Sequence, residues 1–102
     1  MKIIIVGAGK VGLFLTQTLT EENHDVTVVD TDPHALERMQ ESCDALSVLG
    51  HGATRQKLSE AEADTANLLI ATTGSDEINL LSCLTARKMG CRHTIARVRN
   101  PE

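Results

Sequence analysis

Short apolar runs recur along the chain, and they alternate with segments whose apolar residues repeat at helical spacing. Continuous runs rich in β-branched residues are typical of parallel strands that are covered on both faces. The alternation of such strands with helices predicts an α/β domain before any motif is considered. The predicted strands are Lys2–Val6, Val26–Asp30, Ala45–Leu49, Leu68–Thr72 and Thr94–Val98.

Capping residues mark where several of the intervening helices begin. Asp32 followed by proline predicts an N-cap and a first helical position, and Thr54 predicts the start of a short helix. Ser75, with acidic residues after it, predicts the start of a helix that ends at Gly90. The segment 60–67 is rich in Ala, Glu and Asp, and we predict a surface connection there that builds little of the core.

Helical spacing also predicts which faces are buried. Val11, Leu15 and Leu19 share one face of the first helix. The helix after Ser75 has apolar residues on more than one face, and the simpler interpretation is that it is buried on all sides. The alternative is that one face meets another subunit, because a sheet covers only one stripe of a helix. Its apolar residues are Ile78, Leu80, Leu81, Cys83, Leu84, Ala86 and Met89.

The first strand runs directly into a glycine-rich loop, Gly7-Ala8-Gly9-Lys10-Val11-Gly12, that opens the first helix. In this pattern Gly7 permits a tight turn, Gly9 admits a pyrophosphate close to the backbone, and Gly12 lets the helix pack close to the sheet. The helix N-terminus then offers free N–H groups and a favourable dipole to phosphates. Lys10 either adds a cation for a phosphate or is simply solvated.

Asp30 ends the second strand and completes this pattern. An acidic residue about 20 positions after the glycine loop accepts hydrogen bonds from ribose hydroxyls and repels a 2′-phosphate. Its place at a strand end also predicts that Asp30 contributes little to the fold. The alternatives are a tight turn that binds nothing and an aspartate that only favours the turn.

Ligands of doubly wound sheets bind at the carboxyl ends of the strands, where the strand order reverses. This rule brings the glycine loop, Asp30-Thr31 and Thr72-Thr73-Gly74 to one crevice. His51 follows the third strand, so it either lies near the adenine end of a nucleotide or is an ordinary polar turn residue. Arg97 contacts a phosphate or ribose if its side chain returns to the crevice, and is otherwise solvated.

These patterns predict one Rossmann-like domain over residues 1–102, with a doubly wound parallel sheet of strand order 3-2-1-4-5. Arg97 and Arg99 alternate with apolar residues in the last predicted strand, which is typical of an edge strand. Because the complete fold has six strands, we expect the sequence to be a fragment of a longer protein, truncated before a sixth strand.

Composition argues against several other classes of function. Aromatic residues make up 1% of the chain and the net charge is −4, so neither base stacking nor neutralisation of phosphates favours binding to nucleic acid. Cys43, Cys83 and Cys91 form no metal-binding pattern and indicate reduced thiols of a cytosolic protein. No stretch approaches the ~20 apolar residues that cross a bilayer, so we expect no direct membrane insertion.

Two longer blocks are more specific than the glycine loop: SDEINLLSCLTARKMG at 75–90 and IARVRNPE at 95–102. With these blocks, Gly50-His51-Gly52, the glycine loop and Asp30 in order, the chain resembles the TrkA N-terminal domain family, also called KTN or RCK domains, over essentially its whole length. The chain departs from many relatives in having His51 where they have Asp, and we expect the family's C-terminal ligand-binding domain to lie in the part of the longer protein that this sequence does not include.

The resemblance implies that NAD+ or NADH binds here, with ATP and ADP as possible competitors. The family positions that match are Gly7–Val11, Asp30, Thr73-Gly74 and Arg97. It also implies a cytoplasmic regulatory subunit of a bacterial potassium uptake system. Such a subunit forms a homo-oligomer, a dimer or a tetramer, and docks through a membrane potassium-transport subunit on the cytoplasmic face of the inner membrane. Nucleotide occupancy then controls potassium transport.

The main alternative is the cofactor-binding domain of an NAD-dependent oxidoreductase. Such an enzyme needs an acid or base positioned at the nicotinamide. His24, His34 and His93 lie at element ends with no paired carboxylate at a spacing that suggests catalysis, so we expect no catalytic residue and no metal site. A third interpretation is an assembly domain that keeps the fold and binds no nucleotide.

Overall fold

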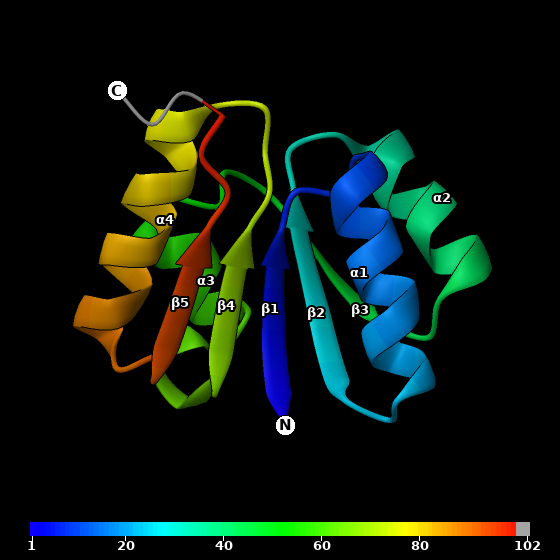
Figure 1. Ribbon diagram of the computed structural model, residues 1–102, viewed down its shortest axis with the longest axis horizontal. Coiled ribbons are helices and arrows are strands. Elements are labelled where there is room, and N and C mark those ends of the chain that lie inside the picture. Colours follow the sequence, from blue (N-terminus) through cyan, green and yellow to red (C-terminus); the bar gives the residue numbers. More distant parts are fainter. Residues whose placement is uncertain (100–102) are drawn as a thin grey trace.

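Five parallel strands form one sheet in the order β3-β2-β1-β4-β5, as the sequence predicts (Figure 1). The structure is a computed structural model and describes residues 1–99. The last residues of the block at 95–102 therefore lie outside the described residues. The strands, each within two residues of its predicted bounds, are β1 (Lys2–Val6), β2 (Asp25–Asp30), β3 (Leu46–Leu49), β4 (Leu68–Ala71) and β5 (His93–Ala96).

Helices connect the strands, and their predicted caps are confirmed. The side chains of Asp32, Thr54 and Ser75 each accept a hydrogen bond from a backbone N–H of the first helical turn. Gly90 ends the last helix with a φ of 120°, a conformation that favours glycine. The helices are α1 (Lys10–Glu21), α2 (Pro33–Ser42), α3 (Arg55–Glu60), the 3-10 helix η1 (Ala63–Thr65) and α4 (Asp76–Met89).

The sheet lies between two helical layers, with α1 and α2 on one face and α3 and α4 on the other (Figure 1). Successive residues of β1 point to opposite layers, as in any strand. Ile3 and Ile5 pack with α1 and α2, and Ile4 and Val6 pack with α3 and α4. All four are at most 2% exposed. The central strand is thus buried on both faces, and it fixes the point at which the glycine loop begins.

The segment 60–67 differs from the prediction, because it builds part of the core. Ala61, Ala63 and Ala66 are at most 1% exposed and pack in the layer of α3 and α4. Their small side chains let η1 approach α4 closely. At the end of that helix, a Cβ on Gly90 would lie 2.9 Å from the carbonyl oxygen of Asp64. Alanine thus serves here as a core residue rather than as part of a surface connection.

The buried face of α1 is also rotated from the predicted one. Val11 is 37% exposed, whereas Gly12 and Thr16 are buried. The Thr16 hydroxyl donates a hydrogen bond of 2.7 Å to the Gly12 carbonyl, which satisfies its polar group inside the layer. Leu15 and Leu19 pack against the core as predicted. Gly12 and Thr16 form the part of α1 that lies closest to the sheet, because bulkier side chains there would hold the helix away from the loop.

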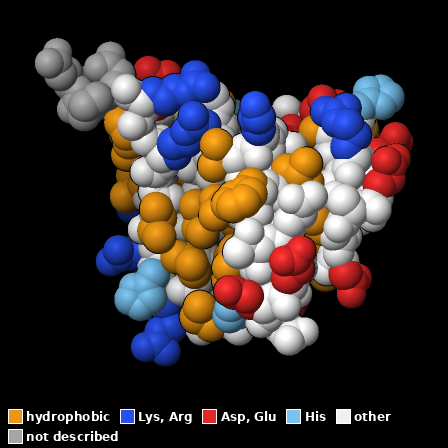
Figure 2. Space-filling model, turned by 45° about the vertical axis from the view of Figure 1, so that its right-hand side comes forward, with side chains coloured by type: hydrophobic (Ala, Val, Ile, Leu, Met, Phe, Trp, Pro, Cys, Tyr) orange, Lys and Arg blue, Asp and Glu red, His pale blue; other side chains and the backbone are white. Residues whose placement is uncertain are grey.

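Two apolar surfaces have no partner among the described residues. Leu80, Leu81 and Leu84 of α4 are 54%, 51% and 55% exposed, so the prediction that this helix is buried on all sides is wrong. On the sheet face that carries α1 and α2, none of the described helices covers β5, and Ile95 is 54% exposed. Figure 2 shows hydrophobic side chains gathered over this part of the sheet face. Phe14 of α1 is 65% exposed.

Candidate functional site

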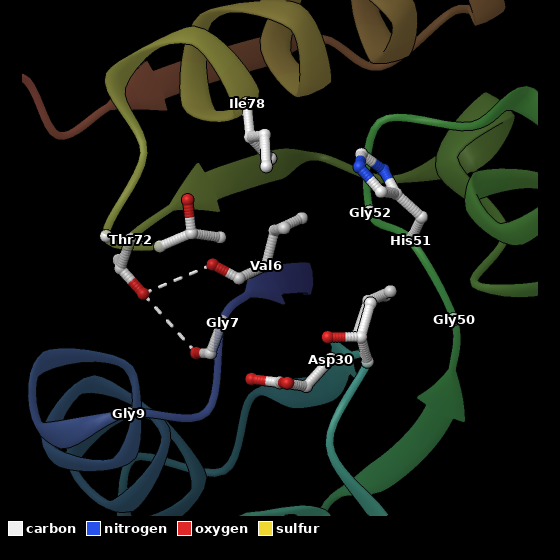
Figure 3. A pocket seen from close by; sticks show the side chains of 13 residues that line it. Val6, Gly7, Gly9, Asp30, Gly50, His51, Gly52, Thr72 and Ile78 are labelled. Atoms are coloured by element: carbon white, nitrogen blue, oxygen red, sulfur yellow. Dashed lines mark hydrogen bonds between the residues drawn. The ribbon is translucent and has the colours of Figure 1, made fainter.

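A pocket of about 310 Å³ lies at the carboxyl ends of the central strands, where the strand order reverses (Figure 3). This is the location that the topology predicts for a ligand. The pocket is lined by Val6, Gly7, Gly9, Val29, Asp30, Thr31, Gly50, His51, Gly52, Thr72, Thr73, Gly74 and Ile78. The lining therefore comes from the ends of β1, β2, β3 and β4 and from the first turn of α4.

Seven of the twelve predicted site residues line this pocket, and the other five lie beside it. Within the glycine loop, Ala8 and Gly12 are buried, while Lys10 and Val11 are exposed in the first turn of α1. Arg97 is partly buried just after β5, and its backbone N–H donates to the Ala71 carbonyl at 2.9 Å. The predicted residues that line the pocket are Gly7, Gly9, Asp30, Thr31, His51, Thr73 and Gly74.

Sequence reasoning did not assign the remaining lining residues, because they contribute backbone or apolar surface rather than a reactive group. Gly50 and Gly52 belong to a motif noted in the sequence, yet the sequence alone does not show their packing. A Cβ on Gly52 would collide with the Val6 side chain, so this glycine lets the loop after β3 cross the end of β1. The unassigned lining residues are Val6, Val29, Gly50, Gly52 and Ile78, whereas Thr72 belongs to a segment that the topology rule places at the crevice.

Two glycines of the loop have the roles that the pattern predicts. Gly7 has a φ of 107°, which permits the turn off β1. A Cβ on Gly12 would collide with the Gly7 carbonyl, so only glycine lets α1 start this close to the sheet. The Gly7 backbone N–H donates to the Val29 carbonyl at 2.8 Å. The loop is therefore a defined turn that directs the N-terminus of α1 toward the pocket.

Gly9 and Gly74 differ from these glycines, because the fold itself does not require them. A Cβ on either residue would meet no heavy atom within 4 Å. Neither has a φ in the left-handed region, so an alanine could adopt either backbone conformation. Both residues line the pocket. Space is thus left open at two points of the lining, on loops that follow two different strands.

Asp30 holds the glycine loop as well as lining the pocket. Its Oδ2 accepts a hydrogen bond of 2.7 Å from the Ala8 N–H, and its Oδ1 accepts one of 2.8 Å from the Asp32 N–H. A carboxylate has about four acceptor sites, so each oxygen can accept a further bond from a ligand. We expected Asp30 to contribute little to the fold. The structure differs, because this side chain joins the end of β2 to the loop after β1.

Thr72 joins the loop after β4 to the same region. Its hydroxyl lies 3.2 Å from the Val6 carbonyl and 3.3 Å from the Gly7 carbonyl, the two bonds drawn in Figure 3. Its backbone N–H also donates to Val6 at 2.8 Å. The residue is buried, so these bonds satisfy polar groups that water does not reach. The loops after β1 and β4 therefore form one connected rim.

His51 stands on the side of the pocket formed by the ends of β2 and β3 (Figure 3). Its Nδ1 lies 3.1 Å from the Ala53 backbone N–H and accepts that hydrogen bond. A neutral imidazole that accepts at Nδ1 carries its proton at Nε2. His51 therefore offers a hydrogen-bond donor to a ligand when it is neutral, in contrast to the acceptor that an aspartate would offer.

Two properties of the described residues bear on metal and thiol chemistry. Residues 1–99 hold no group of three or more His, Cys, Asp or Glu side chains placed to bind a metal ion. Burial raises the pKa of the Cys83 and Cys91 thiols, which keeps them in the less nucleophilic protonated form. In the same range, no helix is both long and apolar enough to span a membrane.

The fold and the pocket first define the class of protein. It is an α/β domain of the Rossmann type, with an open pocket over a glycine loop. The chain belongs to the TrkA-N domain family, whose model matches residues 3–102. It is 42% identical over 102 residues to the Trk system potassium uptake protein TrkA homolog of Archaeoglobus fulgidus. That alignment covers 100% of this chain and 23% of the relative.

A second relative and a solved structure extend the comparison. The TrkA homolog of Methanothermobacter thermautotrophicus is 38% identical over 102 residues, covering 100% of this chain and 47% of that protein. The structure of the GsuK channel bound to NAD is similar with a TM-score of 0.82 and 28% identity, over 97% of this chain and 18% of that chain. The chain thus spans only part of the length of these proteins.

Proposed function

We propose that this chain is the nucleotide-binding regulatory domain of a potassium uptake system. It binds NAD+ or NADH, with ATP or ADP as the alternative ligands, and does not consume them. The family and the names of the relatives support the link to potassium uptake. The NAD-bound channel that shares the fold supports the choice of ligand.

The observation that carries the proposal is the pair of open glycines, Gly9 and Gly74. Packing and backbone conformation explain neither, whereas the close approach of a phosphorylated ligand explains both. Gly9 is the N-cap of α1, where free N–H groups and the helix dipole favour the pyrophosphate. The absence of side chains at both points gives an extended ligand access to the backbone of both loops.

The other lining residues receive the remaining parts of a dinucleotide in this proposal. Asp30 accepts hydrogen bonds from the adenosine ribose and repels a 2′-phosphate, and Thr31 and His51 lie toward the adenine. Thr73 and Gly74 border the nicotinamide half. The side chains of Lys10 and Arg97, which are not among the lining residues, reach phosphate oxygens by a change of rotamer.

The unpartnered leucine face of α4 supports the assembly part of the proposal. Exposed apolar patches of this kind mark contact surfaces, and Leu80, Leu81 and Leu84 form one on a single helix. We propose that this face packs in a homo-oligomer of the complete protein. The oligomer docks on a membrane potassium-transport subunit, which keeps the domain at the cytoplasmic face of the inner membrane without inserting it.

The test is to titrate the purified chain with NAD+, NADH, ATP and ADP and to measure binding by calorimetry. The chain has no Trp or Tyr, so the fluorescence of bound NADH is read without protein emission from those residues. We expect NADH to bind and NADPH to bind more weakly, because Asp30 faces the position of the 2′-phosphate. Absence of binding by all four nucleotides would favour the nucleotide-free assembly domain.

A second assay separates the regulator from an oxidoreductase. The chain is incubated with NAD+ and a panel of oxidisable hydroxy acids, and separately with NADH and the matching keto acids. We expect binding without turnover. Sustained production of NADH in the first mixture, or its consumption in the second, would favour the cofactor domain of an enzyme instead.

A further inference from the structure

The side chain of Asn79 is the most completely bonded polar group beside the pocket. It belongs to the first turns of α4 and is 0% exposed. Its Oδ1 accepts hydrogen bonds from the Thr73 N–H at 2.9 Å and from the Thr73 hydroxyl at 2.6 Å. Its Nδ2 donates to the Thr73 carbonyl at 3.1 Å and to the Arg97 carbonyl at 2.8 Å.

These four bonds use the full capacity of an amide side chain, which has two acceptor sites and two donor hydrogens. Three of them hold Thr73, so both backbone groups and the hydroxyl of that residue are fixed by one side chain. The fourth reaches the chain just after β5. No other natural side chain of this size offers two donors and two acceptors in one plane. Asn79 is therefore bonded to two separate segments at once, the loop after β4 and the chain after β5.

The residues that Asn79 holds border only one half of the pocket. Thr73 and Gly74 line it beside the first turn of α4, whereas Asp30, Thr31 and His51 line it beside β2 and β3. In the first group, Asn79 holds Thr73 directly, and Gly74 follows it in the chain. In the second group, none of the hydrogen bonds among the described residues involves Asn79: Asp30 accepts from the Ala8 and Asp32 N–H groups, and His51 accepts from the Ala53 N–H. A change at Asn79 thus acts on one half of a bound dinucleotide.

We propose that Asn79 is a positioning residue that sets the β4–α4 loop for the nicotinamide half of NAD(H) and couples that half to the end of β5. This inference rests on the proposed function. Asn79 touches no ligand itself, and it acts through Thr73 on the pocket and through the Arg97 carbonyl on the chain that leaves the sheet. Binding that orders the loop then orders the exit of β5, whereas a ligand without a nicotinamide half does neither.

The first test compares two ligands on the whole chain. NADH contains both halves of the dinucleotide, and ADP contains only the adenosine half with two phosphates. In Asn79→Ala we expect the affinity for NADH to fall about tenfold, as for the loss of one to two hydrogen bonds, and the affinity for ADP to stay within about twofold. A general loss of structure would lower both affinities together.

The matched control is Ser82→Ala, in the next turn of the same helix. Ser82 is 0% exposed, and within the described residues its hydroxyl has no hydrogen-bond partner. Its removal therefore changes a buried polar side chain of α4 without touching the Asn79 bonds. We expect Ser82→Ala to keep the wild-type affinity for both ligands. Equal losses of NADH affinity in Ser82→Ala and Asn79→Ala would overturn the role of Asn79.

Amide hydrogen exchange on the wild-type chain tests the coupling even if Asn79→Ala does not fold. The Thr73 N–H donates to Asn79, and the Arg97 N–H donates to the Ala71 carbonyl. We expect NADH to slow exchange at both amides and ADP to slow neither. Equal protection by the two ligands, or protection of Thr73 without Arg97, would overturn the inference. Absence of binding by either ligand would instead overturn the proposed function on which the inference rests.

Discussion

The two loops that border the pocket are held in place by different chemistry. The glycine loop, residues 7–12, is bonded to the carboxylate of Asp30, which remains partly exposed. The β4–α4 loop, residues 72–75, is bonded to the amide of Asn79, which is fully buried. Each loop nevertheless presents one glycine that packing does not require. The bonds that shape the loops and the gaps that admit a ligand are thus separate features.

The choice of a carboxylate at Asp30 and an amide at Asn79 follows from how deeply each polar group is buried. A charge is costly to bury, and Asp30 keeps its charge at the edge of the pocket, where free acceptor sites face a ligand. A neutral amide is cheaper to bury when all its hydrogen bonds are made, and Asn79 is sealed behind the loop. In the function that we propose, the β2 side of the pocket therefore recognises the ribose, whereas the α4 side positions the β4–α4 loop.

The largest effect is expected where a glycine serves packing rather than the ligand. Gly12→Val should lower the free energy of unfolding by about 3 kcal/mol or more, because the new side chain collides with the Gly7 carbonyl. Denaturant unfolding followed by far-UV circular dichroism measures this. A variant as stable as wild type would mean that α1 can shift away from the loop without cost, which would remove the distinction between Gly12 and Gly9.

Gly9→Val should do the opposite: keep the fold and abolish NADH binding. Its Cβ would meet no atom of the protein within 4 Å, so we expect a change in unfolding free energy below about 1 kcal/mol. The branched side chain would occupy the space required by the pyrophosphate. Calorimetry and denaturation on the same sample check both parts. NADH affinity at the wild-type level would show that the ligand lies elsewhere.

Asp30→Ala should affect both properties, since Asp30 belongs to the fold and to the pocket. We expect NADH binding to weaken by about 1.5–3 kcal/mol, the range for hydrogen bonds to a charged group, and stability to fall by about 1–2 kcal/mol through the lost Ala8 and Asp32 bonds. Asp30→Asn is the control of equal size. It keeps one acceptor oxygen but loses the charge, so discrimination against NADPH should decrease. Unchanged NADH affinity in Asp30→Ala would exclude a ribose contact.

The smallest effect is expected where the two loops meet. Thr72→Val keeps the shape of the side chain and removes the hydroxyl that lies near the Val6 and Gly7 carbonyls. We expect a loss of about 1 kcal/mol in stability, as for one ordinary hydrogen bond, and equal small losses of affinity for NADH and ADP. Thermal unfolding and parallel titrations measure these. A loss of affinity for NADH alone would show that Thr72, like Asn79, acts on the nicotinamide half rather than on the contact between the two loops.

Much of the fold was predictable because its signals are local. Apolar runs, the caps at Asp32 and Ser75, and the glycine loop each depend on neighbouring residues, and the strand order follows from the rule for doubly wound sheets. Asp30 was predictable as a pocket residue because the motif fixes its distance from the loop. The pocket itself then forms where the topology requires it.

The features that sequence reasoning missed depend on contacts between distant segments. Asn79 resembles any polar residue near a helix start until Arg97, which follows another strand, is seen beside it. The alanines of segment 60–67 are core residues only because η1 packs against both α3 and α4. Val11 and Leu84 are apolar at helical spacing, but only the position of each helix on the sheet decides which of its sides meets solvent.

The exposed leucines lie on α4, the helix whose first turn also lines the pocket. Ile78 faces the ligand space, and Leu81 is one turn further along. If a neighbouring subunit packs on Leu81 and prefers one orientation of α4, then thermodynamic linkage requires reciprocity. The factor by which assembly strengthens nucleotide binding must equal the factor by which the nucleotide strengthens assembly. The isolated chain and the assembled protein would then have different affinities for one and the same pocket.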